Sequence, residues 1–241
     1  MPTNPCKVPD SAFDMKRIIL AVYLVLWPCL GLADLSGMES PPEIADRLQK
    51  RYEALKSISF HFSQDTSSEL GGRPKKGSGD AYFLRRAEGG KMRWNYAVPD
   101  RQVLVSDGEA LSMYFAKLNQ MIISDASAIG SQLAYSFFTG TGNIAKDFIV
   151  SAPDAGADHP DGRFKVIKLV PREAESQIQD IHLWVTDNSL IQRMEIRDHF
   201  NTVTTLNLSK IRLNPLEEMD KGELDRLFTF TPPENTEIIR Q

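Results

Sequence analysis

Apolar residues recur along the chain at two different periods, one helical and one typical of strands. Near the start they are spaced three or four residues apart, at Ile44, Leu48, Tyr52 and Leu55. This spacing places them on one face of a helix, and a proline pair at positions 41 and 42 stands where a helix can begin. The pattern predicts a single amphipathic helix over residues 42–56, whose apolar face packs on a core.

From Ile58 onward the period changes to two, which is typical of half-buried strands. Phe60 and Phe62 continue the alternation, and Met92, Trp94 and Tyr96 share one side of a strand over residues 91–96. Asp107-Gly108 is a strong hairpin turn signal. The pattern predicts further strands at residues 79–84, 102–106, 110–115, 119–124, 163–170, 178–186, 190–198, 200–208, 210–214 and, last, 228–232.

Two stretches interrupt the run of strands. Residues 125–148 lose the alternation, and we expect one or two short helices there, at residues 129–138 among them, joined by a flexible glycine loop. A second helix is expected over residues 217–227. About ten short strands with few helices predict a mainly β (α+β) fold with an antiparallel sheet or barrel, in one domain over residues 34–241. A sheet of this size curls by its own twist, so its apolar face would line a concavity. The helices would then be either part of the core or a lid.

The first 33 residues have the pattern of an export signal. Lys16 and Arg17 precede an apolar run at residues 18–26, and Gly31-Leu32-Ala33 offers the small residues that a signal peptidase accepts. We expect cleavage after Ala33 and a periplasmic mature protein, with Met15 as an alternative start. A retained membrane anchor is the other interpretation, but the run is shorter than the roughly 20 residues needed to span a bilayer.

Composition and charge exclude several classes of protein. Hydrophobic residues make up 41% of the 241 residues, charged residues make up 25%, and the net charge is -4. The absence of a basic excess argues against nucleic acid as a partner. The two cysteines, Cys6 and Cys29, both precede the expected cleavage site, which excludes a disulfide-rich mini-protein. Lipidation at Cys29 is disfavoured because bulky residues stand directly before it.

No catalytic or metal-binding motif stands out, so we expect neither an enzyme nor a cofactor. The four histidines lack metal-ligand spacing, and nucleotide-binding and hydrolase motifs are missing. A pair of glycosidase carboxylates remains open, since acidic residues are numerous. His61 and His182 should point away from the apolar face towards solvent. Arg73, Lys75 and Lys76 should form a solvated hairpin tip that could touch a partner or an anionic headgroup.

Four segments resemble the LolA family of periplasmic lipoprotein carriers. They are SISFHFSQ (57–64), GSGDAYFLRR (77–86), KMRWNYAVPDRQVLVSDGEALSMYF (91–115) and FTFTPPE (228–234). The resemblance implies an unclosed antiparallel β-barrel, with an N-terminal helix and short helices that form a lid over an apolar cavity. In this family the cavity holds the acyl chains of a lipoprotein.

The resemblance also implies roles for individual residues. The arginine that latches the lid matches Arg85, with Arg86 as the alternative, because the proline that usually follows this arginine is missing here. The expected cavity residues are Leu48, Tyr52, Leu55, Phe60, Met92, Trp94, Tyr96 and Leu104. The expected lid residues are Leu133, Phe137 and Phe138. Each of the cavity residues can equally be read as plain core.

The partners follow from the same resemblance. The cargo would be acylated lipoproteins, the donor an inner-membrane ABC exporter, and the acceptor an outer-membrane receptor, with the carrier itself a monomer. Three alternatives stay open: a carrier of phospholipid or glycolipid on the same scaffold, a lipid-sensing regulatory domain, and an outer-membrane receptor lipidated at Cys29.

Overall fold

The computed structural model describes residues 39–68, 71–86, 89–126, 137–139, 142–156, 162–173 and 177–241. The chain divides into two units, and the description concerns the second unit, Glu39–Gln241. The expected export signal with its cleavage after Ala33, the alternative start at Met15, Cys29, and the lid residue Leu133 lie outside the described residues.

The N-terminal helix α1 spans Pro41–Glu53. Glu43 caps its start, because its carboxylate accepts a hydrogen bond from the Ser40 backbone N–H at 2.8 Å. The helix ends three residues earlier than the periodicity predicts. The backbone N–H groups of Lys56 and Ser57 instead donate to the Asn214 side-chain oxygen, at 2.9 and 3.2 Å. This contact from the far end of the chain turns the backbone into the first strand.

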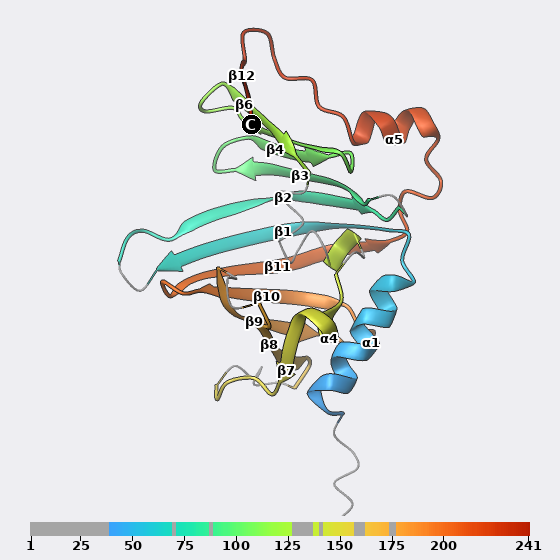
Figure 1. Ribbon diagram of the computed structural model, residues 1–241, viewed down its shortest axis with the longest axis vertical. Coiled ribbons are helices and arrows are strands. Elements are labelled where there is room, and N and C mark those ends of the chain that lie inside the picture. The colour runs from blue at the N-terminus through green and yellow to red at the C-terminus, as the bar shows by residue number, and fades with distance from the viewer. Residues whose placement is uncertain are drawn as a thin grey trace, which may run out of the picture. The chain divides into compact units, whose positions relative to one another are not determined.

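Twelve strands form one open sheet (Figure 1). In chain order they are β1 (Ser57–Ser68), β2 (Lys75–Leu84), β3 (Lys91–Val98), β4 (Gln102–Ser106), β5 (Ala110–Phe115), β6 (Gln120–Asp125), β7 (Phe148–Ser151), β8 (Lys165–Pro171), β9 (Ile178–Val185), β10 (Ile191–Asp198), β11 (Thr202–Leu213) and β12 (Glu237–Arg240). The spatial order is β12-β6-β5-β4-β3-β2-β1-β11-β10-β9-β8-β7. All neighbours are antiparallel except β12, which pairs parallel to β6. The predicted mainly β, unclosed antiparallel architecture is therefore confirmed.

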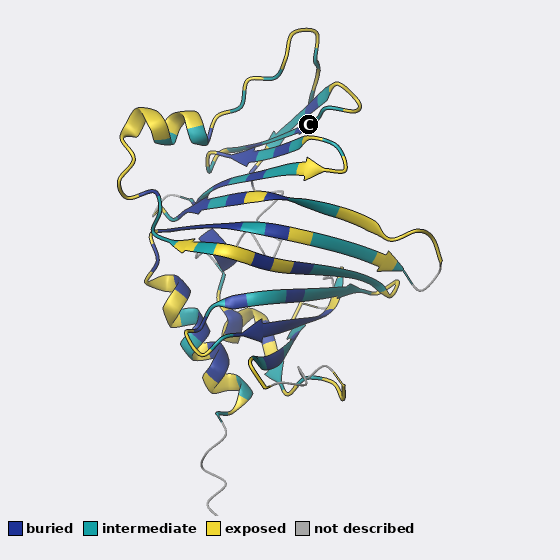
Figure 2. Ribbon diagram, turned by 180° about the vertical axis from the view of Figure 1, so that it is seen from behind, coloured by how far each residue is buried: buried dark blue, intermediate teal, exposed yellow. Residues whose placement is uncertain are grey.

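Buried and more exposed residues alternate along many of the strands, as predicted (Figure 2), so successive side chains lie on opposite faces of the sheet. We call the face that carries Phe60 and Phe62 the inner face, and the opposite face the outer face. The predicted hairpin at Asp107-Gly108 joins β4 to β5, because the Asp107 carboxylate accepts the N–H groups of Glu109 and Ala110 and Gly108 adopts a φ of 104°. The basic tip residues Arg73, Lys75 and Lys76 are exposed, as expected.

Several expected boundaries were wrong. The strands expected at 200–208 and 210–214 are one strand, β11, with an irregularity near Lys210, whose φ is 51°. Helix α5 (Lys221–Leu227) begins later than expected because Asp220 caps it, accepting the Glu223 N–H at 2.8 Å. Residues 228–232 form no strand, and the last strand is β12. Helix α4 (Ile144–Asp147) lies within residues 125–148, where short helices were expected, whereas strand β7, also of four residues, was not expected.

Buried side chains gather mainly on the inner face. One cluster joins α1 and α4 to strands from β5 across to β7, so the sheet packs around these helices. The outer face carries two smaller clusters under the C-terminal segment. None of the helices in the described ranges is long and apolar enough to cross a bilayer.

Candidate functional site

Five aromatic side chains from three neighbouring strands line the centre of the inner face. They are Phe60 and Phe62 of β1, Phe83 of β2, and Trp94 and Tyr96 of β3. The ring centroids lie 5.8 Å apart for Phe60 and Phe83, 4.6 Å for Phe62 and Trp94, and 4.8 Å for Phe62 and Tyr96. These separations are those of favourable aromatic pairs. We call these five residues the aromatic wall.

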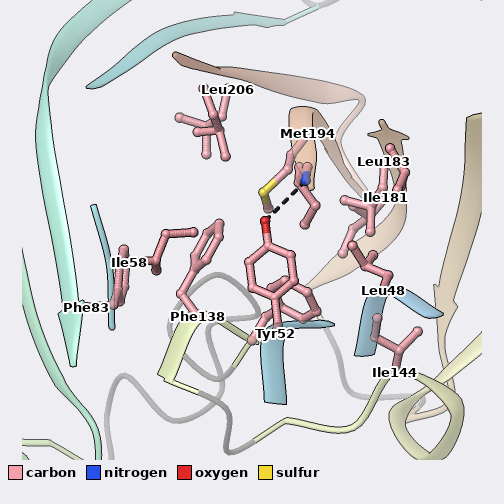
Figure 3. Packing of buried hydrophobic residues seen from close by; sticks show 14 of the residues in the cluster. Leu48, Tyr52, Ile58, Phe83, Phe138, Ile144, Ile181, Leu183, Met194 and Leu206 are labelled. Atoms are coloured by element: carbon pink, nitrogen blue, oxygen red, sulfur yellow. Dashed lines mark hydrogen bonds between the residues drawn. The ribbon is translucent and has the colours of Figure 1, made fainter. Parts of the chain in front are cut away.

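Phe137 and Phe138 lie against helix α1 and the aromatic wall. Figure 3 shows Phe138 beside Tyr52 of α1. The Phe138 ring lies 5.0 Å from Phe60 and 4.9 Å from Phe83, and the Phe137 ring lies 4.4 Å from Tyr52. Both side chains are buried within a short helical turn, residues 137–139. We call this turn the phenylalanine turn. It occupies apolar surface of the inner face.

A glycine makes room for the end of the phenylalanine turn. Thr139 is fully buried, and a Cβ added at Gly90 would lie 2.2 Å from the Thr139 Cβ. No real Cβ approaches another atom so closely, so any side chain at position 90 would push the turn outward. Gly90 therefore fixes how deeply the turn can dock.

Tyr52 fixes the last turn of α1 to the sheet. Its hydroxyl accepts a hydrogen bond from the Ile191 backbone N–H of β10 at 3.1 Å (Figure 3). Burial raises the pKa of Tyr52, and the hydrogen bond from Ile191 offsets only part of this rise. The phenol stays neutral, so this part of the inner face carries no charge.

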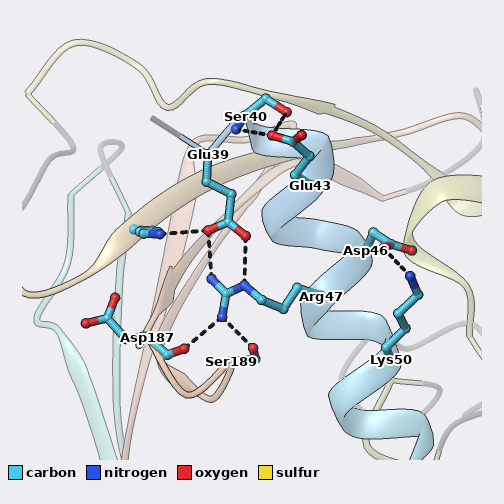
Figure 4. Close-up of polar contacts among 9 residues, drawn as sticks. Glu39, Ser40, Glu43, Asp46, Arg47, Lys50, Asp187 and Ser189 are labelled. Atoms are coloured by element: carbon cyan, nitrogen blue, oxygen red, sulfur yellow. Dashed lines mark hydrogen bonds and ion pairs between the residues drawn. The ribbon is translucent and has the colours of Figure 1, made fainter. Parts of the chain in front are cut away.

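The start of α1 is bound by an ionic network (Figure 4). The Arg47 guanidinium holds both oxygens of Glu39, at 2.8 and 2.9 Å, and also donates to the Asp187 backbone oxygen and the Ser189 hydroxyl. Lys165 of β8 donates to Glu39 at 2.7 Å. The hydrogen bonds from Arg47 and Lys165 lower the pKa of Glu39 to about 2. Strand β8, the β9–β10 turn and α1 are thereby joined.

The predicted latch residue contacts the other end of α1. The Arg85 Nη1 donates to the backbone oxygen of Glu53, the last residue of the helix, at 2.6 Å. Carbonyls at a helix C-terminus lack partners within the helix, and a cation is favoured there. Arg86 is exposed. Of the two candidates, Arg85 is the one that bonds a carbonyl of the predicted N-terminal helix.

Most of the expected cavity and lid residues come together in the inner-face cluster. They are Leu48, Tyr52, Leu55, Phe60, Met92, Trp94, Phe137 and Phe138. Tyr96 and Leu104 are half-buried at the margin of the same cluster. The prediction omitted Phe62 and Phe83, although the alternation with Phe60 already placed Phe62 on the same face. That these residues contact a ligand remains a prediction.

The inner face becomes polar beyond Tyr96. The Tyr96 hydroxyl donates to the Gln64 side-chain oxygen at 2.7 Å, and the Gln64 amide donates to the Thr66 hydroxyl at 3.2 Å. Thr66 is 3.1 Å from the Thr204 hydroxyl. Burial raises the pKa of Tyr96, partly offset by the neighbouring Trp94 indole. We call Tyr96, Gln64, Thr66 and Thr204 the polar margin.

On the outer face, the chain from Asn214 to Phe230 covers strands β2 to β5. We call this segment the C-terminal cover. Its Phe228 packs with Leu84 and Val105. Arg93, on the outer face of β3, donates to the backbone oxygens of Leu227 at 2.9 Å and Thr229 at 3.1 Å. These carbonyls bond a side chain rather than a neighbouring strand, which explains why residues 228–232 do not join the sheet.

The expectation that His182 faces solvent was wrong. Its ring is only 4% exposed and lies 3.4 Å from both the Asp154 and Asp180 carboxylates. The alternation did place it on the outer face, away from the apolar core. However, Asp154 follows β7 and, together with Lys168, covers this part of the sheet. His61 is half-exposed and lies 3.1 Å from Asp80.

The arrangement suits binding of hydrocarbon. The inner face offers aromatic and aliphatic surface under a small covering turn, and within the described residues no three His, Cys, Asp or Glu side chains are grouped to hold a metal. Apolar surface of this kind binds apolar chains through the hydrophobic effect, which is non-directional.

Comparison with known proteins gives a match over most of the chain. The sequence profile described as "Outer membrane lipoprotein carrier protein LolA" matches residues 53–230. The outer-membrane lipoprotein carrier protein of Alkalilimnicola ehrlichii is 28% identical over 224 residues, which are 92% of this chain and 96% of that protein. The protein of the same name from Nitrosomonas europaea is 32% identical over 167 residues, 69% of this chain and 74% of that protein.

Among solved structures, a LolA superfamily protein from Nitrosomonas europaea is similar, with a TM-score of 0.39 and 13% identity. The comparison covers 80% of this chain and 99% of that chain. The strand order, rather than this loose similarity, establishes the open antiparallel sheet of the present chain.

Proposed function

Because the chain belongs to the LolA family, we infer that it is a periplasmic carrier of outer-membrane lipoproteins. The observation that supports this role best is the aromatic wall under the phenylalanine turn. The apolar inner face is covered by a segment of three described residues, which an acyl chain can displace without unfolding the sheet.

The need for such a carrier follows from the size of the hydrophobic effect. Each buried methylene is worth roughly 0.8 kcal/mol, so a sixteen-carbon chain represents on the order of 12 kcal/mol when exposed to water. A lipoprotein with several such chains will not cross an aqueous compartment unaided. A carrier must shelter the chains and still release them.

Displacement of the phenylalanine turn meets both requirements. In the free protein, Phe137 and Phe138 occupy apolar surface that an acyl chain would otherwise cover. A chain that binds there replaces these aromatic contacts, so the net gain is smaller than the full transfer free energy. When the chain leaves, the turn docks again, which favours release.

Arg85 acts as the latch in this scheme. Its hydrogen bond to Glu53 ties β2 to the end of α1 in the closed protein, and opening for cargo breaks it. A hydrogen bond to a charged group is worth about 1.5 kcal/mol or somewhat more, and partial exposure of Arg85 reduces this to about 1 kcal/mol. The latch therefore weakens cargo binding about fivefold.

The test of the latch compares Arg85→Leu with Arg86→Leu. Arg85→Leu should admit a purified acylated lipoprotein, bind it about fivefold more tightly, and transfer it to acceptor more slowly. Arg86→Leu should behave like the natural protein because the Arg86 side chain is exposed. Transfer by Arg85→Leu at the natural rate would refute the latch assignment.

The remaining partners are part of the proposal. An inner-membrane ABC exporter would supply the energy and load the carrier, and an outer-membrane receptor would accept the cargo. The export signal would be removed after Ala33. The carrier would act as a monomer, without enzymatic activity.

The cargo class is tested by mass spectrometry of lipids and proteins that co-purify with the protein from the periplasm. Triacylated or diacylated lipoprotein is the expected result. Free phospholipid or glycolipid alone would instead identify a carrier of that lipid on the same scaffold. Palmitate labelling of the protein itself would indicate a receptor anchored at Cys29.

A further inference from the structure

The Trp94 indole carries a hydrogen-bond donor for which the described residues provide no partner. Trp94 is 7% exposed, its Nε1 atom is buried, and this atom makes no hydrogen bond to any part of the chain that the structure describes. An indole nitrogen can only donate. Buried donors of this kind are rare, because leaving one unmet costs free energy that a ligand can recover.

The groups around Trp94 offer few acceptors for the indole N–H. The nearest rings are those of Phe60, Phe62 and Phe83, which carry no acceptor oxygen. The Tyr96 hydroxyl lies close enough for the indole N–H to lower the pKa of Tyr96, but the hydroxyl donates its own proton to Gln64, and its position relative to the indole is not that of a hydrogen bond. The donor is therefore open on a face that is otherwise apolar.

Trp94 also lies at the boundary between two regions of the inner face. Towards α1, β3 continues with Met92, which is buried in the apolar cluster together with Phe138. In the other direction β3 continues with Tyr96, the first residue of the polar margin. A ligand that covers this face therefore meets hydrocarbon on one side of Trp94 and hydroxyl and amide groups on the other.

An acylated lipid has the same order of chemical groups. Its hydrocarbon tail ends in an ester or amide carbonyl, an acceptor without a proton of its own when the linkage is an ester, and the polar head group follows. This arrangement matches the sequence of apolar cluster, lone indole donor and polar margin.

We propose that the Trp94 indole N–H binds the carbonyl oxygen of an acyl linkage and thereby sets the depth at which a chain is held. The tail then lies along Phe60, Phe83 and Met92, and the head group lies at Tyr96 and Gln64. This assignment rests on the proposed carrier function and deepens it, because it explains how the site distinguishes an acyl lipid from a plain hydrocarbon.

The test uses two synthetic lipopeptides that differ only at the linkage. One carries a glyceryl-cysteine with two palmitoyl esters, and the other has the same two sixteen-carbon chains joined by ethers, which lack the carbonyl. The natural protein should bind the ester about tenfold more tightly than the ether, equivalent to about 1.4 kcal/mol. Its Trp94 indole ¹⁵N–¹H resonance should shift downfield only with the ester.

Variants separate the indole N–H from the aromatic ring. Trp94→Phe keeps a ring but removes the donor, so it should bind both lipopeptides equally, with the affinity that the natural protein has for the ether. Trp184→Phe, on the outer face, should keep the tenfold preference.

Each result bears on one of the two claims. If the natural protein binds both lipopeptides equally, or Trp94→Phe retains the ester preference, the carbonyl assignment is wrong and the carrier function stands. If neither lipopeptide binds, the proposed function itself fails. The ester-to-ether ratio of the natural protein decides the matter even if Trp94→Phe does not fold.

Discussion

The two faces of the same strands are covered in different ways. On the inner face, the phenylalanine turn contacts Phe60 and Phe83 through its aromatic rings. On the outer face, the C-terminal cover combines buried Phe228 with hydrogen bonds from Arg93 to two backbone oxygens. A hydrocarbon chain can replace ring contacts, because these are non-directional, but it cannot replace a hydrogen bond to a carbonyl. The two hydrogen bonds of Arg93 therefore make the outer cover harder for a hydrocarbon chain to displace.

The largest effect is expected for Phe228→Ala in the outer cover. Phe228 is 3% exposed, and loss of a buried phenylalanine side chain costs about 3–5 kcal/mol of unfolding free energy. Urea denaturation measures this loss. Phe200→Ala is the control, because Phe200 is 74% exposed and should change stability by less than about 0.5 kcal/mol. A small loss for Phe228→Ala would mean that the outer cover is displaceable too.

Arg93→Met tests whether hydrogen bonds make the outer cover permanent. Burial, and to a smaller extent the charge of Arg101, lowers the pKa of Arg93, but the guanidinium stays charged and its two bonds are charge-assisted. Removal of these two hydrogen bonds should lower the free energy of unfolding by about 1.5–3 kcal/mol and speed hydrogen exchange of the amides in α5. Arg101→Met is the matched control, since Arg101 also lies over the Phe230 ring but is exposed. Equal effects of both variants would argue that charge alone holds the cover.

Phe138→Ala should have a smaller effect on stability than Phe228→Ala, although both side chains are buried phenylalanines. A segment that opens locally can contribute no more than its own opening free energy, which we expect to be about 1–2 kcal/mol. Phe138→Ala should also bind an acylated lipopeptide more tightly, because the ligand then displaces fewer contacts of the phenylalanine turn. Titration calorimetry and urea denaturation measure the two effects. A stability loss as large as that of Phe228→Ala would show that the turn is fixed core.

The smallest effect is expected at Glu39. Its carboxylate anchors the start of α1, so this helix should stay on the inner face when the phenylalanine turn is displaced. The pKa of Glu39 is lowered from 4.5 to about 2, so its ionised form stabilises the fold above pH 4.5, and this contribution is lost as the pH falls towards 2. Glu39→Gln should cost about 1 kcal/mol or less at pH 7, since the pair is partly exposed. The difference from the natural protein should vanish near pH 2. A difference that is independent of pH would contradict the ionic role.

Local pattern was sufficient for the parts of the fold that depend on neighbouring residues. Alternation placed Phe60, Trp94 and Tyr96 on one face, and the Asp107-Gly108 turn signal located the β4–β5 hairpin. The spacing of Leu48 and Tyr52 predicted α1 and its buried face. These features follow from the period of each element, which the sequence displays directly.

Sequence periodicity did not predict the contacts between segments that are distant in the chain. Asn214 ends α1 from more than 150 residues away, and Arg93 keeps residues 228–232 out of the sheet. The burial of His182 depends on Asp154 in another loop. Trp94 was predicted as a ligand-facing residue. That its indole N–H has no acceptor among the described residues could not be predicted, because periodicity does not show which side chains surround it.

An open sheet exposes two edges at which a second molecule could add a strand, and both edges here are short. Strand β7 at one edge and β12 at the other have four residues each, and β12 begins at Glu237 and ends at Arg240. Short edge strands discourage edge-to-edge polymerisation, and at β12 the charges of Glu237 and Arg240 add to this effect. The sheet can therefore stay open around a bound acyl chain without the protein polymerising through its edges.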